Sequence, residues 1–542
     1  MTKYAKWFWR QMEGIRLRLM LRIFAGLIQV GLGLLLVWLS RRFIDVSIWQ
    51  DGIWRDTVVL LSVVTLLVFV REVVYFLTNT ADCLLENSMR QRLFQLVLGR
   101  KMYADAGSLH SGDVCQRLEQ DVYTVGVIIT EVLPNMVVTV AQLVSAFLLM
   151  RYFDSWLAWS LLLSTPVVVA TAKYLSHRLK QMTLDIRDEE SMVQKSIQEG
   201  VEQSLAVKVL QGEGVMAGRL RKMHSHLQSL VFRRVRFILV SRLLLGLSFG
   251  FGYFGAFIYG GIQLRNGVIT IGVMTAFLQL VSQIQSPIMT LLGMIPQLIR
   301  SAASVDRISE IERLEQEPPL VPSLLGDGGS MGIRMENVTY SYPDAHAPVL
   351  SAFSHDFKPG TSTALLGETG QGKTTILRII SGLIVPQQGK ISLYGGKNGE
   401  EVSGMEMRQH LVYITQGNTL MSGTIRANLL LAAPEATDEE MNKALHTAVA
   451  DFVFGLPAGI DTVIGEHAAR LSEGQAQRIA IARGLMRKGE VMLLDEISSA
   501  LDVETEKELF RRLSVNFPDR TIVCVTHRPE AANACDDILR LG

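Results

Sequence analysis

The chain has 542 residues, of which 49% are hydrophobic and 19% charged, and its mean hydropathy is +0.26. These values are too apolar for an ordinary soluble globular protein of this length, so we expect a bilayer to solvate part of the chain. Lys and Arg together number 53 and Asp and Glu 52, which gives a formal net charge of +1. This balance provides no long-range attraction to nucleic acid, and we expect no nucleic-acid partner. The four cysteines lack C-x-x-C spacing and supply neither a disulfide framework nor a zinc site.

Apolar stretches occur in the first half of the chain, and each has about 20 residues, enough to cross ~30 Å of hydrocarbon. The six predicted spans lie near residues 20–40, 57–77, 132–152, 156–176, 237–262 and 270–298. Arg16, Arg18 and Arg22 flank the start of the first span, and no small-residue cleavage site follows it. We therefore expect a retained span with a cytoplasmic N-terminus, not a removed signal peptide.

The loops between the spans are unequal in length. Those after the second and fourth spans run over about residues 78–131 and 177–236, and the second of them is rich in Lys and Arg. The positive-inside tendency places both long loops, both termini and the C-terminal half in the cytoplasm. The loops contain few Gly or Pro and many good helix formers, so we predict long helical extensions of the spans.

A change in composition marks a domain boundary. Residues 313–330 are rich in Pro, Gly and polar residues and have no hydrophobic period, which is typical of a linker. Before it, residues 1–312 are predicted to form an all-α, six-helix transmembrane domain. After it, residues 331–542 alternate short apolar runs with helical patterns, which predicts a soluble α/β domain whose parallel sheet is covered on both faces.

A glycine-rich loop follows the predicted strand 363–366 and opens a predicted helix. Its sequence, Gly-Glu-Thr-Gly-Gln-Gly-Lys-Thr, is the pattern of a phosphate-binding loop, whose glycines let successive backbone N–H groups face one point. The Lys373 ammonium is expected to neutralise the β- and γ-phosphates, and the Thr374 hydroxyl to ligate magnesium. The residues expected to hold nucleotide here are Gly367, Glu368, Thr369, Gly370, Gln371, Gly372, Lys373, Thr374 and Thr375.

Two carboxylates end the apolar strand predicted at 491–494. The carboxyl end of a strand in an open parallel sheet is where such a sheet presents groups to ligands. Asp495 suits a magnesium shell, and Glu496 suits a general base or a water-orienting group. Two acids at a strand end are more often ordinary polar caps, but a phosphate loop in the same domain favours the catalytic interpretation.

A second anion-binding helix start is predicted between these motifs. Residues 471–475 read Leu-Ser-Glu-Gly-Gln and precede a helical pattern. Within one domain, this helix start can hardly reach the phosphate loop of the same chain. We therefore predict that the nucleotide is shared between two chains.

The ordered set of motifs resembles the ATP-binding cassette (ABC) transporter superfamily, and specifically the exporter-type half-transporter with six spans and one nucleotide-binding domain. The matching motifs are the Walker A loop 367–374, the Q-loop residue Gln416, the signature 471–475, the Walker B strand 491–496, the D-loop 499–502, the switch histidine His527 and the adenine-stacking aromatic Tyr342. The resemblance implies the P-loop NTPase fold for the α/β domain.

The resemblance also implies the roles of individual residues. Gln416 would reach magnesium, with Thr374 and Asp495, and the attacking water, while His527 would hold the γ-phosphate and position Glu496. Across the dimer interface, ATP bound by the partner would be contacted by Ser472, Gly474 and Gln475, with Asp502 beside them. The coupling loops that contact such domains would lie near 104–121 and 207–220, and residues 465–466 would touch them.

Two departures from the family pattern stand out. Glu473 replaces the second glycine of the signature, but Ser472 and Gly474 remain, so we expect activity to survive. The chain ends at Gly542, shortly after His527, where family members commonly continue. This ending is expected to be either a natural short form or a trimmed one.

We predict an ATP-hydrolysing exporter or flippase that uses ATP and Mg²⁺ as a dimer of this chain and moves a lipid, hydrophobic drug, peptide or glycolipid. Two alternatives stay open: one half of a heterodimer with a related half-transporter, and a nucleotide-sensing receptor or scaffold without transport. Gln279, Gln283, Ser286 and Thr290 share one face of the sixth span, where they line a cavity or bond to another helix. The expected location is a bacterial inner membrane, as a multi-pass protein surrounded by lipid.

Overall fold

The structure is a computed structural model of the 542-residue chain. It describes residues 2–47, 53–101, 111–318, 329–342, 347–368, 370–396, 400–417, 419–465, 471–498, 500–528 and 532–541. The chain divides into two compact units, one of Met1–Leu98 with His110–Arg313 and one of Gly99–Leu109 with Leu314–Gly542. Of the residues singled out in the sequence, Thr369, Ser499, Glu466, Gly542 and those at 104–110 lie outside the described residues.

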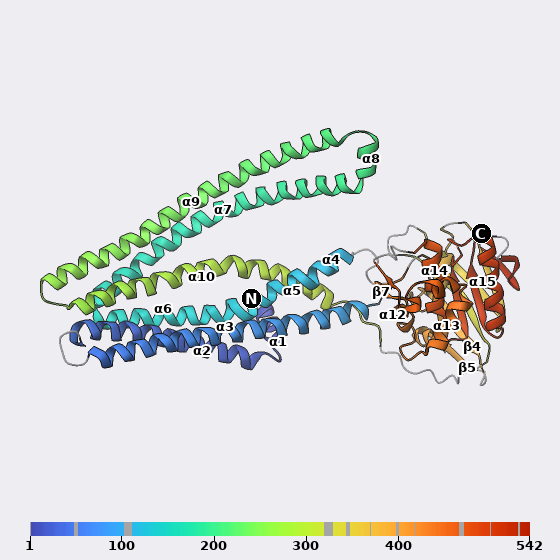
Figure 1. Cartoon of the computed structure of the whole chain (residues 1–542), viewed down its shortest axis with the longest axis horizontal. Helices are drawn as coiled ribbons and strands as arrows, with labels where there is room; N and C mark the ends of the chain where they lie inside the picture. The colour runs from blue at the N-terminus through green and yellow to red at the C-terminus, as the bar shows by residue number, and fades with distance from the viewer. Residues whose placement is uncertain are drawn as a thin grey trace. The chain divides into compact units, whose positions relative to one another are not determined.

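The first unit is helical (Figure 1). Its α-helices are α1 (Thr2–Gln11), α2 (Arg16–Arg42), α3 (Ile53–Leu98), α4 (Ser111–Gln116), α5 (Val122–Val127), α6 (Leu133–Phe153), α7 (Ser155–Glu202), α8 (Ser204–Val209), α9 (Glu213–Arg265) and α10 (Ile271–Glu312). Short π-helical segments η1 (Phe43–Ser47), η2 (Arg117–Asp121) and η3 (Ile128–Val132) interrupt or extend them. Such segments insert an extra residue into a helix and so adjust the register of its faces.

Five helical segments among the described residues are long and apolar enough to cross a membrane. They are Arg16–Val46, Ile53–Leu98, Gly112–Phe153, Glu213–Arg265 and Ile271–Glu312. The remaining predicted span, 156–176, falls within α7, where the side chains of several residues are outside the description. The segments match the apolar stretches from which the spans were predicted.

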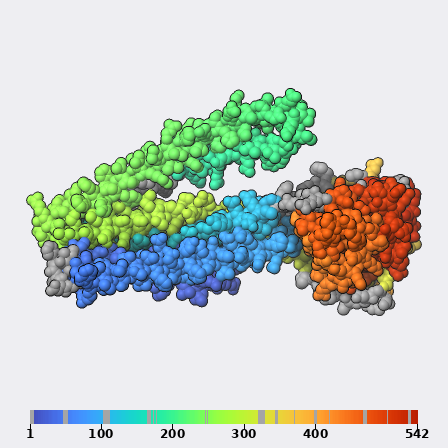
Figure 2. Space-filling model, in the orientation of Figure 1, coloured from blue at the N-terminus to red at the C-terminus, as the bar shows by residue number. Residues whose placement is uncertain are grey.

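Several helices of this unit are far longer than a bilayer is thick. The helices α3, α7 and α9 have 46, 48 and 53 residues, against the ~20 that a span requires. The predicted helical extensions are therefore confirmed. The helices α7 and α9 lie side by side and are joined at one end by α8, where the hairpin stands apart from the other helices of this unit (Figures 1 and 2).

The short helix α1 is anchored to the end of α10 through one carboxylate. Glu312 accepts hydrogen bonds from Trp7 Nε1 at 2.8 Å, Arg10 Nη2 at 3.0 Å and Gln11 Nε2 at 3.2 Å. Arg92 of α3 donates to the same carboxylate at 2.9 Å. One side chain at the last position of α10 thus gathers three elements.

The described residues of the second unit form three sheets. A five-stranded sheet has the order β11-β3-β10-β9-β6, a four-stranded sheet the order β2-β1-β4-β5, and a small sheet pairs β7 with β8. The strands are β1 (Met331–Tyr340), β2 (Leu350–Phe357), β3 (Ser362–Leu366), β4 (Gln388–Gly395), β5 (Glu400–Ser403), β6 (Leu411–Ile414), β7 (Gly423–Thr424), β8 (Val463–Ile464), β9 (Val491–Asp495), β10 (Thr521–Val525) and β11 (Asp537–Arg540). The helices are α11 (Lys373–Ile380), α12 (Ile425–Leu430), α13 (Asp438–Thr447), α14 (Glu473–Leu485) and α15 (Val503–Asn516), with the 3₁₀ turns η4 (Gly404–His410), η5 (Asp451–Gly455) and η6 (Gly459–Asp461).

All neighbours in the five-stranded sheet are parallel, with Val523 of β10 between Thr363 of β3 and Leu493 of β9. The alternation of side chains along β9 divides the core in two. Met492 and Leu494 pack with α13 and α14, whereas Val491 and Leu493 pack with α11 and the antiparallel sheet. The parallel sheet is covered on both faces, as predicted, and all its strands end at one edge.

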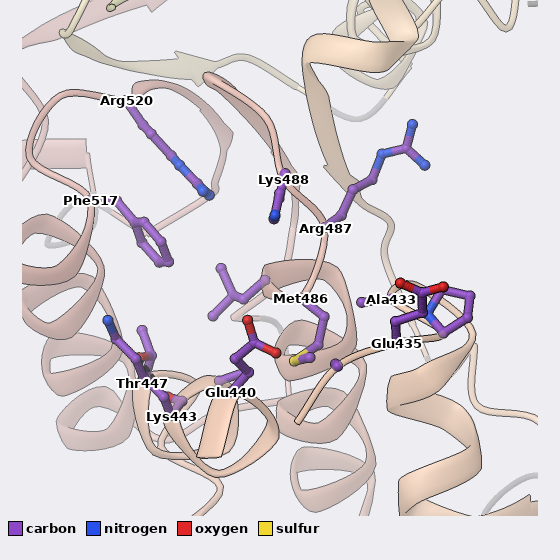
Figure 3. A pocket seen from close by; sticks show the side chains of 14 residues that line it. Ala433, Glu435, Glu440, Lys443, Thr447, Met486, Arg487, Lys488, Phe517 and Arg520 are labelled. Carbon is purple, nitrogen blue, oxygen red and sulfur yellow. Dashed lines mark hydrogen bonds between the residues drawn. The ribbon is translucent and has the colours of Figure 1, made fainter. Parts of the chain in front are cut away.

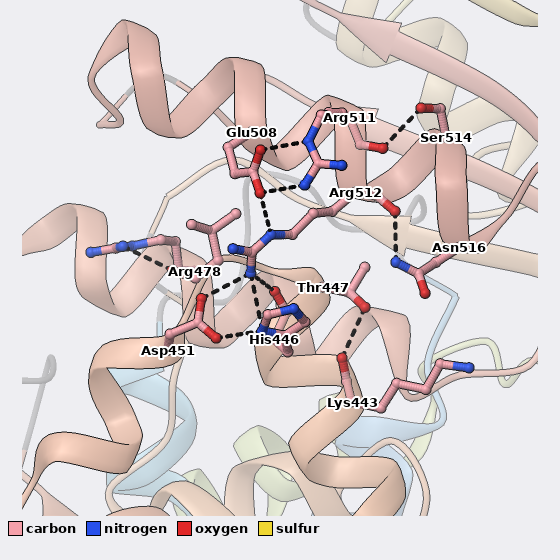
Figure 4. Close-up of polar contacts among 11 residues, drawn as sticks. Lys443, His446, Thr447, Asp451, Arg478, Glu508, Arg511, Arg512, Ser514 and Asn516 are labelled. Atoms are coloured by element: carbon pink, nitrogen blue, oxygen red, sulfur yellow. Dashed lines mark hydrogen bonds and ion pairs between the residues drawn. The ribbon is translucent and has the colours of Figure 1, made fainter.

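A polar network joins α13 and η5 to α15 (Figure 4). Arg512 of α15 donates to Asp451 Oδ2 at 2.8 Å and to the carbonyl of His446, and its Nε donates to Glu508 at 2.7 Å. His446 Nδ1 also bonds Asp451 Oδ1 at 2.6 Å. The helices on this face of the sheet are thus held by charged as well as apolar contacts.

Candidate functional site

The phosphate loop leaves β3 at Leu366 and turns sharply into α11. Gly370 and Gly372 have φ values of +94° and +87°, in the left-handed region that glycine adopts at no steric cost. At Gly372 a Cβ atom would also lie 2.9 Å from Val349 Cγ1. This conformation places the N-terminus of α11, which starts at Lys373, against the loop.

Lys373 is buried at 5% exposure and extends over the loop. Its Nζ donates to the carbonyl oxygens of Gly367 at 2.8 Å and Glu368 at 2.9 Å. Among the described residues no carboxylate pairs with this ammonium. The charge is therefore available to an anion at the helix N-terminus.

Thr374 and Asp495 meet where α11 and β9 face each other. The Thr374 hydroxyl donates to Asp495 Oδ1 at 3.1 Å, and the Tyr413 hydroxyl donates to Oδ2 at 3.1 Å. Burial raises the pKa of Asp495, and these two hydrogen bonds oppose that rise. The structure describes no cluster of three or more acidic, His or Cys side chains that could hold a metal by itself. A hydroxyl beside a carboxylate nevertheless fits Mg²⁺, which takes few protein oxygens and completes its shell with phosphates and water.

Glu496 follows β9 in a strained conformation, with φ of +48°, and its N–H donates to the Val525 carbonyl at 3.1 Å. Gln416 Nε2 donates to its Oε2 at 2.6 Å, and His527 Nε2 lies 3.0 Å from Oε1. Each oxygen of this carboxylate is thus held by a different residue. An oriented, partly exposed carboxylate of this kind can accept a proton from water.

A buried amide that the sequence analysis missed supports this site. Gln477 of α14, at 3% exposure, donates from Nε2 to the Glu496 carbonyl at 3.4 Å and accepts from the Ala500 N–H at 3.2 Å. Gln477 therefore connects α14 to the backbone at Glu496, just before the D-loop, and at Ala500 within the D-loop. The sequence gives no distinct signal for this role, since Gln477 is one of two glutamines in α14.

The signature residues form their own helix cap. The Ser472 hydroxyl accepts from Gln475 N at 3.2 Å, and the Gln475 side chain accepts from Ser472 N at 3.0 Å, a capping box at the start of α14. A Cβ at Gly474 would lie 2.7 Å from the Ala500 carbonyl, so only glycine fits there. Asp502 caps α15 in the same way by accepting from Thr505 N at 2.9 Å, and this hydrogen bond is the main reason for the low pKa of Asp502.

Tyr342 stands against the outer side of α11. Its hydroxyl lies 3.3 Å from Thr375 Oγ1 and 3.5 Å from Arg378 Nη1, and its ring packs edge-on against Tyr340 with centroids 5.1 Å apart. The aromatic ring is thus fixed beside the helix that the phosphate loop opens.

The side chain of Gln371 folds back over the phosphate loop, where its Oε1 accepts a hydrogen bond from Glu368 N at 2.6 Å.

The structure brings one group of predicted residues together and keeps another apart. Lys373, Thr374, Asp495, Glu496, Gln416 and His527 share the carboxyl edge of the parallel sheet. The hydrogen bonds described for Ser472, Gly474, Gln475 and Asp502 lie outside this group.

Two family models match the chain. "ABC transporter transmembrane region" matches residues 19–288 and "ABC transporter" matches residues 350–499. The chain belongs to the ABC transporter superfamily. It has the half-transporter arrangement, with a helical membrane domain followed by one ATP-binding cassette, and it is a multi-pass membrane protein that binds ATP and couples its hydrolysis to transport.

Relatives within this superfamily are distant in sequence. The chain is 28% identical over 470 residues to the ABC multidrug transporter mdr2 of Aspergillus fumigatus, with 84% of this chain and 57% of that protein aligned. It is 28% identical over 464 residues to the ATP-dependent lipid A-core flippase of Bordetella avium, with 84% and 77% aligned. The structure of a bacterial Atm1-family ABC exporter with ATP bound has the same fold, with a TM-score of 0.80, 20% identity, and 98% of this chain and 94% of that chain covered.

Proposed function

We propose that two copies of this chain form an ATP-driven exporter or flippase that hydrolyses ATP at two composite sites. Residues 1–312 would form the membrane domain of each copy, 313–330 the linker and 331–542 the cassette. The observation that carries the proposal is the Glu496 carboxylate, held between Gln416 and His527 beside the Thr374–Asp495 pair. This arrangement supplies both an anion site and an oriented base.

The residues divide the work of hydrolysis. Lys373 and the α11 N-terminus would bind the phosphates, while Thr374, Asp495 and Gln416 would hold Mg²⁺, which neutralises phosphate charge when bound. Glu496 accepts the proton of the attacking water. His527 orients that carboxylate from one side and Gln416 from the other.

A second copy would complete each site. The side chains of Ser472 and Gln475 shape the N-terminus of α14 into a capped helix start that belongs to a different part of the cassette from the phosphate loop. In a two-fold pair each copy would offer this tip to the ATP of the other, giving two equal sites. Closing and opening of the cassettes would then alternate the access of the membrane domains.

The polar face of α10 supports an amphipathic cargo. Gln279, Ser286 and Thr290 are exposed on the chain by itself, whereas Phe277, Leu280 and Ile284 on the opposite face are buried. A polar face on a membrane helix must meet protein or a water-filled cavity. With lipid A-core flippases among the relatives, this favours a lipid or glycolipid over a soluble peptide, and a bacterial inner membrane as the location.

The test is ATPase activity of the purified chain in lipid nanodiscs. Glu496→Gln is expected to reduce turnover by at least ~100-fold while MgATP still binds, because the variant removes the base and keeps the hydrogen-bonding shape. The matched control is Glu504→Gln, at an exposed carboxylate in the first turn of α15. Full turnover in Glu496→Gln would overturn the assignment of the base.

Cargo is tested in the same preparation. Lipids, glycolipids, hydrophobic drugs and peptides are added separately, and stimulation of Glu496-dependent turnover identifies the class. Stimulation by a soluble peptide alone, with none by amphipathic lipids, would refute the lipid assignment but leave the ATP-driven motor intact.

A further inference from the structure

A hollow of about 610 Å³ lies in the cassette at the end of the sheet opposite the predicted ATP site (Figure 3). Its walls come from residues 433–436, from α13, from the end of α14 with the turn at 486–488, and from the turn at 517–520. These turns lead into β9 and β10, so the hollow adjoins the amino ends of strands whose carboxyl ends reach Asp495 and His527. The volume is within the ~300–1,000 Å³ typical of small-molecule sites.

One wall carries a guanidinium whose hydrogen bonding is incomplete. Arg520 stacks on Phe517 with its Cζ 4.1 Å from the ring centroid, and its Nη1 is buried with no hydrogen-bond partner among the described residues. A buried donor without an acceptor is destabilising, so this side chain gains if a small rotation brings Nη1 to an acceptor in the hollow. Burial lowers the pKa of Arg520, and attraction to the Glu490 carboxylate opposes this only in part, so a further anion beside Arg520 would favour its charged form.

Two lysines add to this charge. Figure 3 shows Lys488 on the same side of the hollow as Arg520 and Lys443 across from them, with Phe517 between Arg520 and Lys443 and Met486 below Lys488. Neither ammonium has an ion pair within 4.0 Å among the described residues. Four cationic side chains and two carboxylates, Glu435 and Glu440, therefore line the hollow together with the apolar side chains of Phe517 and Met486.

The remaining charged side chains of the hollow are occupied or lie to one side. Glu440 accepts from Thr437 N at 2.8 Å through Oε2, as the partner of Thr437 in the capping box of α13, and Lys488 attracts this carboxylate through space. Arg487 donates to the carbonyls of Leu411 at 3.1 Å and Arg408 at 2.8 Å. Glu435 lies with Arg487 on the side away from Phe517 (Figure 3).

We propose that this hollow is a second ligand site, which binds a soluble organic phosphate with its phosphate on Arg520, Lys488 and Lys443 and a planar or apolar body against Phe517 and Met486. Phosphate matches the cations, and an organic body matches the two apolar side chains. Such a ligand would add a polar link between α13 and the turn before β10, which already share an apolar cluster through Phe517. Neither the hydrolysis mechanism nor the proposed cargo path uses these residues.

The probe is pyridoxal 5′-phosphate, an organic phosphate whose aldehyde condenses with a lysine amine, with loss of water, to an imine that borohydride reduces to a secondary amine. The full-length chain in phosphatidylcholine nanodiscs is labelled over a concentration series, and each lysine is quantified by peptide mass spectrometry. Pyridoxal, which lacks phosphate, is the ligand control. Lys358, an exposed lysine outside the hollow, is the internal control.

We expect saturable labelling of Lys488 or Lys443 at concentrations that leave Lys358 unlabelled, and no saturable labelling by pyridoxal. Arg520→Gln should lower this labelling about tenfold, the effect of losing one charge-assisted hydrogen bond, whereas Lys358→Gln should not change it. Arg520→Lys, which keeps a cation, should restore part of the labelling. Unchanged basal ATPase activity shows that each variant is folded.

Two results would overturn the proposal: labelling of Lys443 and Lys488 that is no stronger than that of Lys358, or labelling that is equal in the wild type and Arg520→Gln. Because labelling is read at single lysines without hydrolysis, either result would leave the proposed transport function untouched. The labelling is repeated in nanodiscs in which anionic lipid replaces part of the phosphatidylcholine. If the anionic lipid abolishes the labelling, the site binds a lipid headgroup, and the proposal of a soluble ligand is wrong.

Discussion

Gln477 is a single buried residue on which the position of the predicted base depends. Its amide holds the Glu496 carbonyl and the Ala500 N–H, so the strained backbone at Glu496 is fixed from the signature helix. A residue in left-handed conformation persists only where its surroundings determine it. We infer that Gln477 is a positioning residue.

Gln477→Leu keeps the side-chain bulk and removes both hydrogen bonds. We expect kcat to fall by about tenfold or more, because Glu496 loses its support, while the KM for ATP changes little, since Lys373 and Thr374 are untouched. Steady-state ATPase kinetics in nanodiscs measure both constants. Gln388→Leu, at an exposed amide on β4, is the control and should have no effect.

The raised pKa of Asp495 predicts how the stability of the chain depends on pH. Burial raises the pKa of Asp495 in the folded chain above the usual value of 3.8. Between these two pKa values, the folded state binds a proton at Asp495 that the unfolded state has released. Stability of the nucleotide-free chain therefore falls as pH rises from 3.8 through the raised pKa. Asp495→Asn should melt at a higher temperature than the wild type near neutral pH and lose this pH dependence.

Thermal melts of the nucleotide-free and Mg²⁺-free protein across that pH range provide the measurement. The same variant should lose Mg²⁺-dependent ATPase activity, since an amide is a weaker magnesium ligand. Equal pH dependence in the variant and the wild type would show that Asp495 is ionised without penalty in the folded state.

At the residue scale, the motif residues could be predicted because each has its own spacing signal: Lys373 lies within the glycine-rich loop, and Asp495 lies at a strand end. The sequence did not predict Gln477, nor that Ser472 and Asp502 cap their own helices. Those roles depend on which backbone groups the fold places nearby. A lone amide or hydroxyl has no such signal in sequence.

At the scale of elements, the polar contact between α13 and α15 depends on Arg512. Burial alone would raise the pKa of Asp451, but hydrogen bonds from Arg512 and His446 outweigh burial and hold the pKa below 3.8. The contribution of this pair to stability is therefore present at neutral pH and lost as pH falls through the lowered pKa. The network of Figure 4 is thus a charged clamp between two helices.

Arg512→Met should destabilise the cassette by about 1–2 kcal/mol at pH 7 and increase amide exchange in α13, because Asp451 and the His446 carbonyl lose a donor. Hydrogen–deuterium exchange of the full chain locates the effect. Arg511→Met is the matched control, since Arg511 pairs only with Glu508 one turn earlier on α15 in the contacts described. Equal exchange in the two variants would mean that apolar packing alone holds α13.

The long helices and the parallel sheet were predictable because apolar length and buried strand runs are local signals. The antiparallel sheet of β1, β2, β4 and β5 was not predicted, since it combines segments as far apart as Met331 and Ser403. Nor was α1, a ten-residue helix of Trp, Tyr, Phe and charged side chains. Helices this short are marginal alone, so its stability comes from tertiary contact.

For the whole molecule, composite sites make a prediction about mixed dimers. A chain with Lys373→Ala lacks a working phosphate loop, and one with Gly474→Asp lacks a working signature, because even a Cβ at Gly474 meets the Ala500 carbonyl. Each should be inactive as a homodimer. A dimer of one copy of each has one site built from two intact halves, so it should trap nucleotide with vanadate at about half the wild-type level.

Differently tagged copies purified in tandem give the mixed dimer, and bound nucleotide is counted per dimer. If sites were complete within one chain, the mixed dimer would trap nothing. A wild-type chain that trapped nucleotide only after adding a related half-transporter would favour the heterodimer instead.

The attachment of α1 to Glu312 sets an order of events during synthesis. Trp7, Arg10 and Gln11 leave the ribosome about 300 residues before their partner, which at ~5–20 residues per second is an interval of roughly 15–60 s. During that interval α1 already has partners, since Phe8 packs against Ile128 and Val132 and Arg92 donates to Gln11 Oε1 at 2.6 Å, but its hydrogen bonds to Glu312 cannot form. The contacts of α1 therefore form in stages, and the completion of α10 adds the carboxylate that ties α1 to α3.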